Sequence, residues 1–124
     1  MSLILASSSP FRKAILERLG VSFITVSPNI DETRKTPETP YDLVHRLAGE
    51  KAKEVAKTHS GLIIASDQVA TLDSGNEEGD EILNKPLTHQ NAFAQLQKSS
   101  GRTATFLTSI ALLNTETGIL QNHV

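Results

Sequence analysis

The chain has 124 residues, with 12 lysines and arginines, 14 aspartates and glutamates, and no cysteine. This length suits one domain with a real core, and the absence of cysteine excludes disulfides and thiolate chemistry. The formal charge of −2 gives no general attraction to nucleic acid polymers or anionic membranes, and no apolar run approaches the ~20 residues of a membrane span. With no signal-peptide pattern at the N-terminus, we expect a cytoplasmic protein.

The first predicted strand is a short apolar run at residues 3–6, and it stops at three serines and a proline. Ser9 is a good N-cap and Pro10 suits the first helical position, so a helix is predicted from there to Gly20. Free backbone N–H groups at such a helix start suit a phosphate, and Arg12 adds a cation nearby. The alternative is an ordinary capped helix with exposed basic residues. The apolar residues of the helix share one face: Phe11, Ile15, Leu16 and Leu19.

Residues 22–26 alternate and are rich in β-branched and aromatic side chains, which predicts a second strand. A polar loop with two adjacent carboxylates, Asp31 and Glu32, follows it. Adjacent acids in a loop are usually solvated. The functional alternative is a Mg²⁺ ligand, because hard cations prefer carboxylate oxygens.

A second helix is predicted from Pro40 to about residue 58, capped by Thr39. Lys51 falls in the middle of its apolar face, where amphipathic patterning does not predict a charge. The lysine either snorkels out along its methylene stem or points into a cleft and holds a charged ligand. We favour the cleft.

The apolar run at residues 62–65 predicts a central strand buried on both faces and ending at residues 66–68. Asp67 then follows a central strand, where carboxylates in α/β sheets meet ligands, so it is a candidate metal ligand or general base. A turn or helix cap is the alternative. Against this alternative, residues 69–72 continue as extended apolar chain, which leaves no helix for Asp67 to cap.

The rest of the chain is predicted as an acidic loop at 73–81, a short strand at 82–84, a helix at 88–98, a strand at 102–113, a turn at 114–118 and a strand from 119. The four histidines show no zinc spacing. The chain stops inside a pairing strand, so it looks truncated at its C-terminus. An exposed strand edge can recruit a second copy, so a homodimer is also considered.

These motifs together resemble the Maf family of nucleoside triphosphate pyrophosphatases, and the likeness runs along the whole chain. The motifs that carry it are residues 3–12 (LILASSSPFR), 31–33 (DET), 46–52 (RLAGEKA), 66–69 (SDQV), 85–87 (KPL) and 100–101 (SG). Within the family the chain looks most like the YceF-type branch, which prefers 7-methyl-GTP. The resemblance implies one α/β domain over residues 1–124, with an elongated, mixed, twisted sheet flanked by helices and a C-terminal part missing.

The resemblance also implies a reaction: cleavage between the α and β phosphates to a nucleoside monophosphate and pyrophosphate, with a divalent cation, Mg²⁺ or Mn²⁺. Asp67 matches the family's proton acceptor, and Glu32 matches an acid near the metal. The positions that match phosphate-binding or basic residues are Ser7, Ser9, Arg12, Lys51 and Lys85. Phe11 and Gln68 match positions linked to the choice of base. Three other functions stay open: a nucleotide-binding regulator of septum formation without catalysis, a dTTP or UTP pyrophosphatase, and an inosine-triphosphate-type enzyme.

Overall fold

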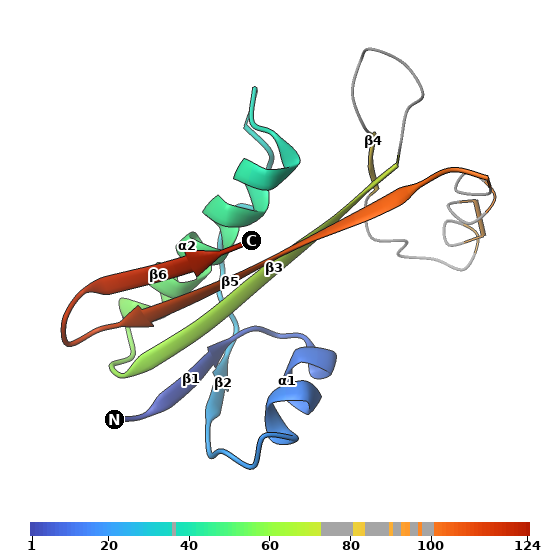
Figure 1. The fold of residues 1–124 in the computed structure, drawn as a ribbon. Coiled ribbons are helices and arrows are strands. Elements are labelled where there is room, and N and C mark those ends of the chain that lie inside the picture. The colour runs from blue at the N-terminus through green and yellow to red at the C-terminus, as the bar shows by residue number, and fades with distance from the viewer. Residues whose placement is uncertain (36, 73–80, 84–89, 91–92, 95–96, 98–100) are drawn as a thin grey trace. The chain divides into compact units, whose positions relative to one another are not determined.

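The computed structural model describes the chain except residues 36, 73–80, 84–89, 91–92, 95–96 and 98–100 (Figure 1). The elements in chain order are β1 (Leu3–Ala6), α1 (Pro10–Glu17), β2 (Ile24–Val26), α2 (Pro40–Ala56), β3 (Leu62–Leu72), β4 (Glu81–Leu83), β5 (Ala104–Asn114) and β6 (Ile119–His123). They form two compact units, Met1–Asp67 with Thr108–Val124, and Gln68–Leu107. No helix in the described part is long and apolar enough to cross a membrane.

The sheet runs in the order β2-β1-β3-β5-β6, and β4 pairs with β3. β1 pairs in parallel with both β2 and β3, so Ala6 lies between Val26 and Ala65. β5 and β6 pair antiparallel, joined by a turn in which the N–H of Gly118 donates to the carbonyl of Asn114. The predicted mixed α/β sheet with flanking helices is therefore confirmed.

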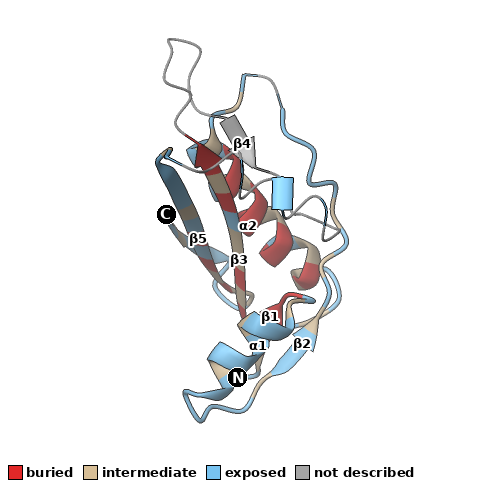
Figure 2. Cartoon of the chain, turned by 90° about the vertical axis from the view of Figure 1, so that its right-hand side faces the viewer, coloured by how far each residue is buried: buried red, intermediate tan, exposed pale blue. Residues whose placement is uncertain are grey.

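The core of the first unit lies between α2 and one face of the sheet. Thr39 caps α2 as predicted, because its hydroxyl accepts the N–H of Asp42 at 3.1 Å. Figure 2 shows the buried stripe along α2 in red. Small side chains on this stripe let the helix approach the strands closely. The core cluster comprises Ile4, Ala6, Ala48, Ala52, Val55, Ile63, Ala65, Ala111 and Leu113.

The first helix differs from the prediction in its length and its burial. α1 ends at Glu17, three residues before Gly20, so Leu19 lies outside it. No residue of α1 is buried: Phe11 is 80% exposed and Ile15 is 62% exposed. The spacing of apolar residues predicts which side chains share a face, but it does not say whether another element packs against that face.

The end predicted for the central strand is wrong. β3 runs without a break from Leu62 to Leu72, so Asp67 lies within the strand and not after it. Three polar side chains in a row do not end a strand, because its continuation depends on backbone hydrogen bonds. The predicted acidic loop, most of the helix predicted at 88–98, and Lys85 lie outside the described residues.

Candidate active site

The parallel strands bring the segments after β1 and β2 close to the middle of β3. Ala6 and Val26, the last residues of β1 and β2, lie level with Ala65 of β3, and β3 continues past them to Leu72. The segment after β1 carries Ser7, and the loop after β2 carries Glu32. Parallel α/β sheets place ligands at the carboxyl ends of their strands.

Lys51 of α2 joins two carboxylates in this region. Its Nζ lies 2.9 Å from Oε1 of Glu32, 3.0 Å from Oδ1 of Asp67 and 3.5 Å from the carbonyl oxygen of Ser66. The side chain of Lys51 is 9% exposed and that of Asp67 is 13% exposed, whereas that of Glu32 is 55% exposed. The lysine therefore does not snorkel to open water. Its charge is neutralised by carboxylates from the loop and from β3.

Ser109, which is not among the residues predicted from the sequence, holds the backbone at Asp67 in place. Its hydroxyl is fully buried, donates to the carbonyl of Val44 at 2.7 Å and accepts the N–H of Asp67 at 3.2 Å. One side chain thus connects β5, β3 and α2. The signal in the sequence is a small hydroxyl residue on the same inward face of β5 as Ala111 and Leu113.

The serines before α1 form a second group. Ser9 is the N-cap, as predicted, and its hydroxyl accepts the N–H of Arg12 at 3.3 Å. The hydroxyl of the buried Ser7 accepts the N–H of Ser9 at 3.0 Å. Within the part of the chain that the structure describes, no hydrogen bond or ion pair joins this group to Lys51. The two candidates for base choice, Phe11 and Gln68, are exposed.

Arg46 fastens the loop that carries Glu32 to α2. Its Nε and Nη2 donate to the two carboxylate oxygens of Glu38, at 2.6 and 2.9 Å. These hydrogen bonds lower the pKa of Glu38 from 4.5 to about 2. Arg46 also donates to the carbonyl of Thr33 and to Glu50. Arg46 begins the motif at residues 46–52, but nothing local in that motif predicts its contacts with the loop.

The donor atoms near Lys51 are of the kind that Mg²⁺ or Mn²⁺ prefers. Glu32 and Asp67 each place a carboxylate oxygen within 3.0 Å of the same ammonium nitrogen. Among the described residues, no group of three or more His, Cys, Asp or Glu side chains is placed so that it could hold a metal ion. Two carboxylates completed by water and substrate phosphates are an ordinary Mg²⁺ environment, so these residues fit such an ion.

A family model for Maf-like proteins matches residues 2–124. The chain belongs to the Maf family. The resemblance noted in the sequence is thereby confirmed over almost the whole chain of this Maf protein.

Curated relatives of this Maf protein carry the name 7-methyl-GTP pyrophosphatase. The one from Pseudomonas syringae pv. tomato is 51% identical over 121 residues, which cover 97% of this chain and 60% of the relative. The one from Alcanivorax borkumensis is 48% identical over 118 residues, covering 94% of this chain and 57% of the relative. This Maf protein therefore spans about 60% of the length of these curated relatives.

Solved structures share the fold of this Maf protein at low sequence identity. The Ham1 protein of Staphylococcus aureus matches with a TM-score of 0.60 and 15% identity, over 98% of this chain and 67% of that one. A nucleoside-triphosphatase described as a dITP/XTP pyrophosphatase, from Mycobacterium abscessus, matches with a TM-score of 0.54 and 22% identity, over 99% and 70%. These likenesses support the α/β fold.

Proposed function

We propose that this Maf protein hydrolyses a nucleoside triphosphate, 7-methyl-GTP in the first place, to a nucleoside monophosphate and pyrophosphate. The observation that carries the proposal is the placement of Lys51 between Glu32 of the loop after β2 and Asp67 within β3. The names of relatives at 48–51% identity support the same reaction. Housecleaning of non-standard nucleotides is the corresponding role in the cell.

In the proposed reaction, water attacks the α-phosphorus, the bond from that phosphorus to the bridging oxygen breaks, and pyrophosphate leaves. Asp67 takes the proton of the attacking water or holds the metal. Glu32 and Asp67 would hold Mg²⁺ or Mn²⁺, which when bound supplies Lewis-acid polarisation of phosphate oxygens. Positive charge and N–H groups balance the charge of the triphosphate. The residues proposed for this are Ser7, Ser9, Arg12, Lys51 and Lys85.

For the choice of base we propose Phe11 and Gln68. The ring of Phe11 is 80% exposed, so it is free of the core and accessible to a ligand. The ring system of 7-methylguanine is positively charged, and an aromatic face attracts a cation by about 0.5–2 kcal/mol. The amide of Gln68 offers a donor and an acceptor for the edge of a base. A cytoplasmic location and a homodimer stay predictions.

The test is a substrate panel with detection of pyrophosphate. It compares 7-methyl-GTP, GTP, dTTP, UTP and ITP, using the 124-residue chain and a version extended with the remaining part of the Pseudomonas syringae relative. We expect release with 7-methyl-GTP preferred. Release from dTTP, UTP or ITP instead would move the protein to another substrate class. Nucleotide binding without release would favour a regulator without catalysis.

A variant of Asp67 tests the proposed role of this residue in the same assay. Asp67→Asn keeps the size of the side chain and removes its negative charge. We expect turnover to fall by about 10²-fold or more, the low end for loss of a general base, while nucleotide binding is largely kept. Glu54→Gln is the control, because Glu54 is an acid of α2 that pairs with the exposed Lys57 at the end of the helix. Normal turnover by Asp67→Asn would remove Asp67 from the reaction.

A further inference from the structure

Arg46 makes four hydrogen bonds from one guanidinium group. Two go to the carboxylate of Glu38, one goes to the carbonyl oxygen of Thr33 at 3.0 Å, and one goes to Glu50 at 3.0 Å. The side chains of Arg46 and Glu38 are only 19% and 10% exposed. A two-pronged contact between arginine and a carboxylate fixes direction as well as distance. The contact with Glu50 stays within α2, whereas the contacts with Glu38 and Thr33 reach the loop between β2 and α2.

The contact with Thr33 lies directly beside Glu32. Glu32 is 55% exposed, so burial does not hold its carboxylate near Lys51. The backbone around it is shaped locally, because Asp31 accepts both the N–H and the hydroxyl of Thr33. That local turn sets the conformation of the loop but does not attach it to α2. Arg46 attaches the loop to α2 next to Glu32, on the same helix that carries Lys51.

We propose that Arg46 is a positioning residue for the candidate active site. By holding Glu38 and the backbone at Thr33 against α2, it keeps the carboxylate of Glu32 on the ammonium of Lys51. None of the four hydrogen bonds of Arg46 involves Lys51, Glu32 or Asp67, so its action on the site is indirect. The functional meaning of this placement rests on the proposed function, but the placement itself can be tested without turnover.

The first test follows the NMR signals of the Lys51 side chain, its Cε and Nζ. Glu32→Gln gives the reference for a Lys51 that lacks a charged partner in the loop. We expect Arg46→Met to shift the Lys51 signals toward that reference and to raise amide exchange at Thr33 by about tenfold or more. Arg46→Lys should give an intermediate result, because an ammonium keeps the charge but cannot make the two-pronged contact. Wild-type Lys51 signals in Arg46→Met would overturn the proposal.

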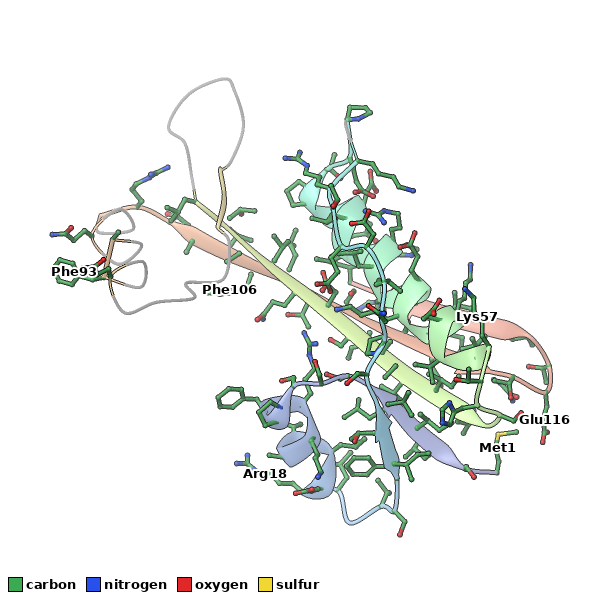
Figure 3. The ribbon with its side chains drawn as sticks, turned by 180° about the vertical axis from the view of Figure 1, so that it is seen from behind. Met1, Arg18, Lys57, Phe93, Phe106 and Glu116 are labelled. Carbon is green, nitrogen blue, oxygen red and sulfur yellow. The ribbon has the colours of Figure 1, made fainter. Side chains whose placement is uncertain are left out.

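Two matched controls separate the loop contacts from ordinary helix pairs. Glu50→Gln removes the partner of Arg46 within α2 and leaves the loop contacts in place. Lys57→Met removes a pair between Lys57 and Glu54 at the end of α2, where Lys57 is labelled in Figure 3 and is 71% exposed. Both should leave the Lys51 signals at their wild-type positions. A shift in Glu50→Gln equal to that in Arg46→Met would show that the helix pair, and not the loop contact, matters.

The second test measures kinetics on the extended chain with 7-methyl-GTP. We expect Arg46→Met to lower kcat by about 10- to 100-fold, since small misplacements of reacting groups have effects of this size, with a smaller change in KM. An unchanged kcat per folded molecule would make Arg46 a purely structural residue. If the wild type releases no pyrophosphate, the proposed function fails, and the Lys51 signals still decide the role of Arg46.

Discussion

Lys51 of α2 and Asp67 of β3, sixteen residues apart in the chain, are joined by a 3.0 Å contact between Nζ and Oδ1. Neither side chain is more than 13% exposed. A lysine on an apolar helix face and a carboxylate that is only 13% exposed would each be costly alone, because water is mostly excluded from both. The ion pairs of Lys51 with Asp67 and Glu32 compensate these charges. The charges of the candidate active site therefore also contribute to the packing of α2 on the sheet.

We expect Lys51→Met to destabilise the protein. From its place on an apolar face alone, removal of the charge would be neutral or stabilising. Its loss, however, leaves the carboxylate of Asp67 without its ion-pair partner, and breaking a buried pair from one side is costly. Because Glu32 is largely exposed and can hydrate, we expect a loss of about 1–3 kcal/mol in urea unfolding. Lys53→Met, which changes an exposed lysine of the same helix, is the control.

A double-mutant cycle measures the interaction energy between Lys51 and Asp67. In the Lys51→Met background, Asp67→Asn removes the carboxylate that has lost its partner. It should therefore be less destabilising there than in the wild type. Equal effects of Asp67→Asn in the two backgrounds would mean that the contact contributes nothing to the stability.

Phe11→Leu should leave the stability almost unchanged. With 80% of its surface exposed, Phe11 has little packing to lose, and exposed substitutions usually stay within about ±0.5 kcal/mol. If its ring contacts the base, the ratio of kcat/KM for 7-methyl-GTP over that for GTP should shrink in the extended chain. Phe93→Leu, at another exposed phenylalanine, serves as the comparison. A large drop in melting temperature would instead place Phe11 in a packed environment.

The pH dependence of stability should report the contact between Arg46 and Glu38. The hydrogen bonds from Arg46 lower the pKa of Glu38 from 4.5 to about 2. A carboxyl group with a lowered pKa in the folded state stabilises fully above its unfolded pKa, and this contribution is lost as the pH falls to the folded value. The window therefore lies between about pH 5 and pH 2. A ¹³C NMR titration of the Glu38 carboxyl group measures the folded pKa directly.

In Arg46→Met we expect the pKa of Glu38 to rise toward its ordinary value, because the largest cause of its lowering is removed. The difference in unfolding free energy between pH 6 and pH 3 should then be smaller than in the wild type. A wild-type midpoint for Glu38 that stays the same after the substitution would contradict this prediction.

Gly61→Ala should be strongly destabilising. Gly61 has a φ of +142°, and a Cβ atom there would lie 2.2 Å from the carbonyl oxygen of Ser2. Backbone strain alone costs about 1–3 kcal/mol, and the clash adds to it. Gly20→Ala is the matched control, since Gly20 has a φ of +72° but no atom within 4 Å of the Cβ position. It should cost about 1 kcal/mol. Equal losses of unfolding free energy in Gly61→Ala and Gly20→Ala, measured in urea, would show that the backbone at Ser2 moves away from the added Cβ atom.

The sequence by itself determined the order and type of most described elements. Caps depend on residues a few positions apart, so Ser9 and Thr39 marked the starts of α1 and α2 correctly. Strand signals are equally local, and they predicted β1, β2, β5 and β6 to within a few residues. The unexpected lysine on the apolar face of α2 also drew attention to Lys51, which contacts two carboxylates in the structure. All of these features depend on interactions between residues a few positions apart, so they can be predicted directly from the sequence.

Only the tertiary structure decided which side chains meet. Glu32, Lys51 and Asp67 come together because the parallel register of β1, β2 and β3 sets where the loop and α2 leave the sheet. The same long-range geometry gave Ser109 and Arg46 their partners and left Phe11 outside the core. Contacts of this kind depend on how elements pack, and packing is determined by the summed burial of many residues. No local pattern around any one of these residues contains that information.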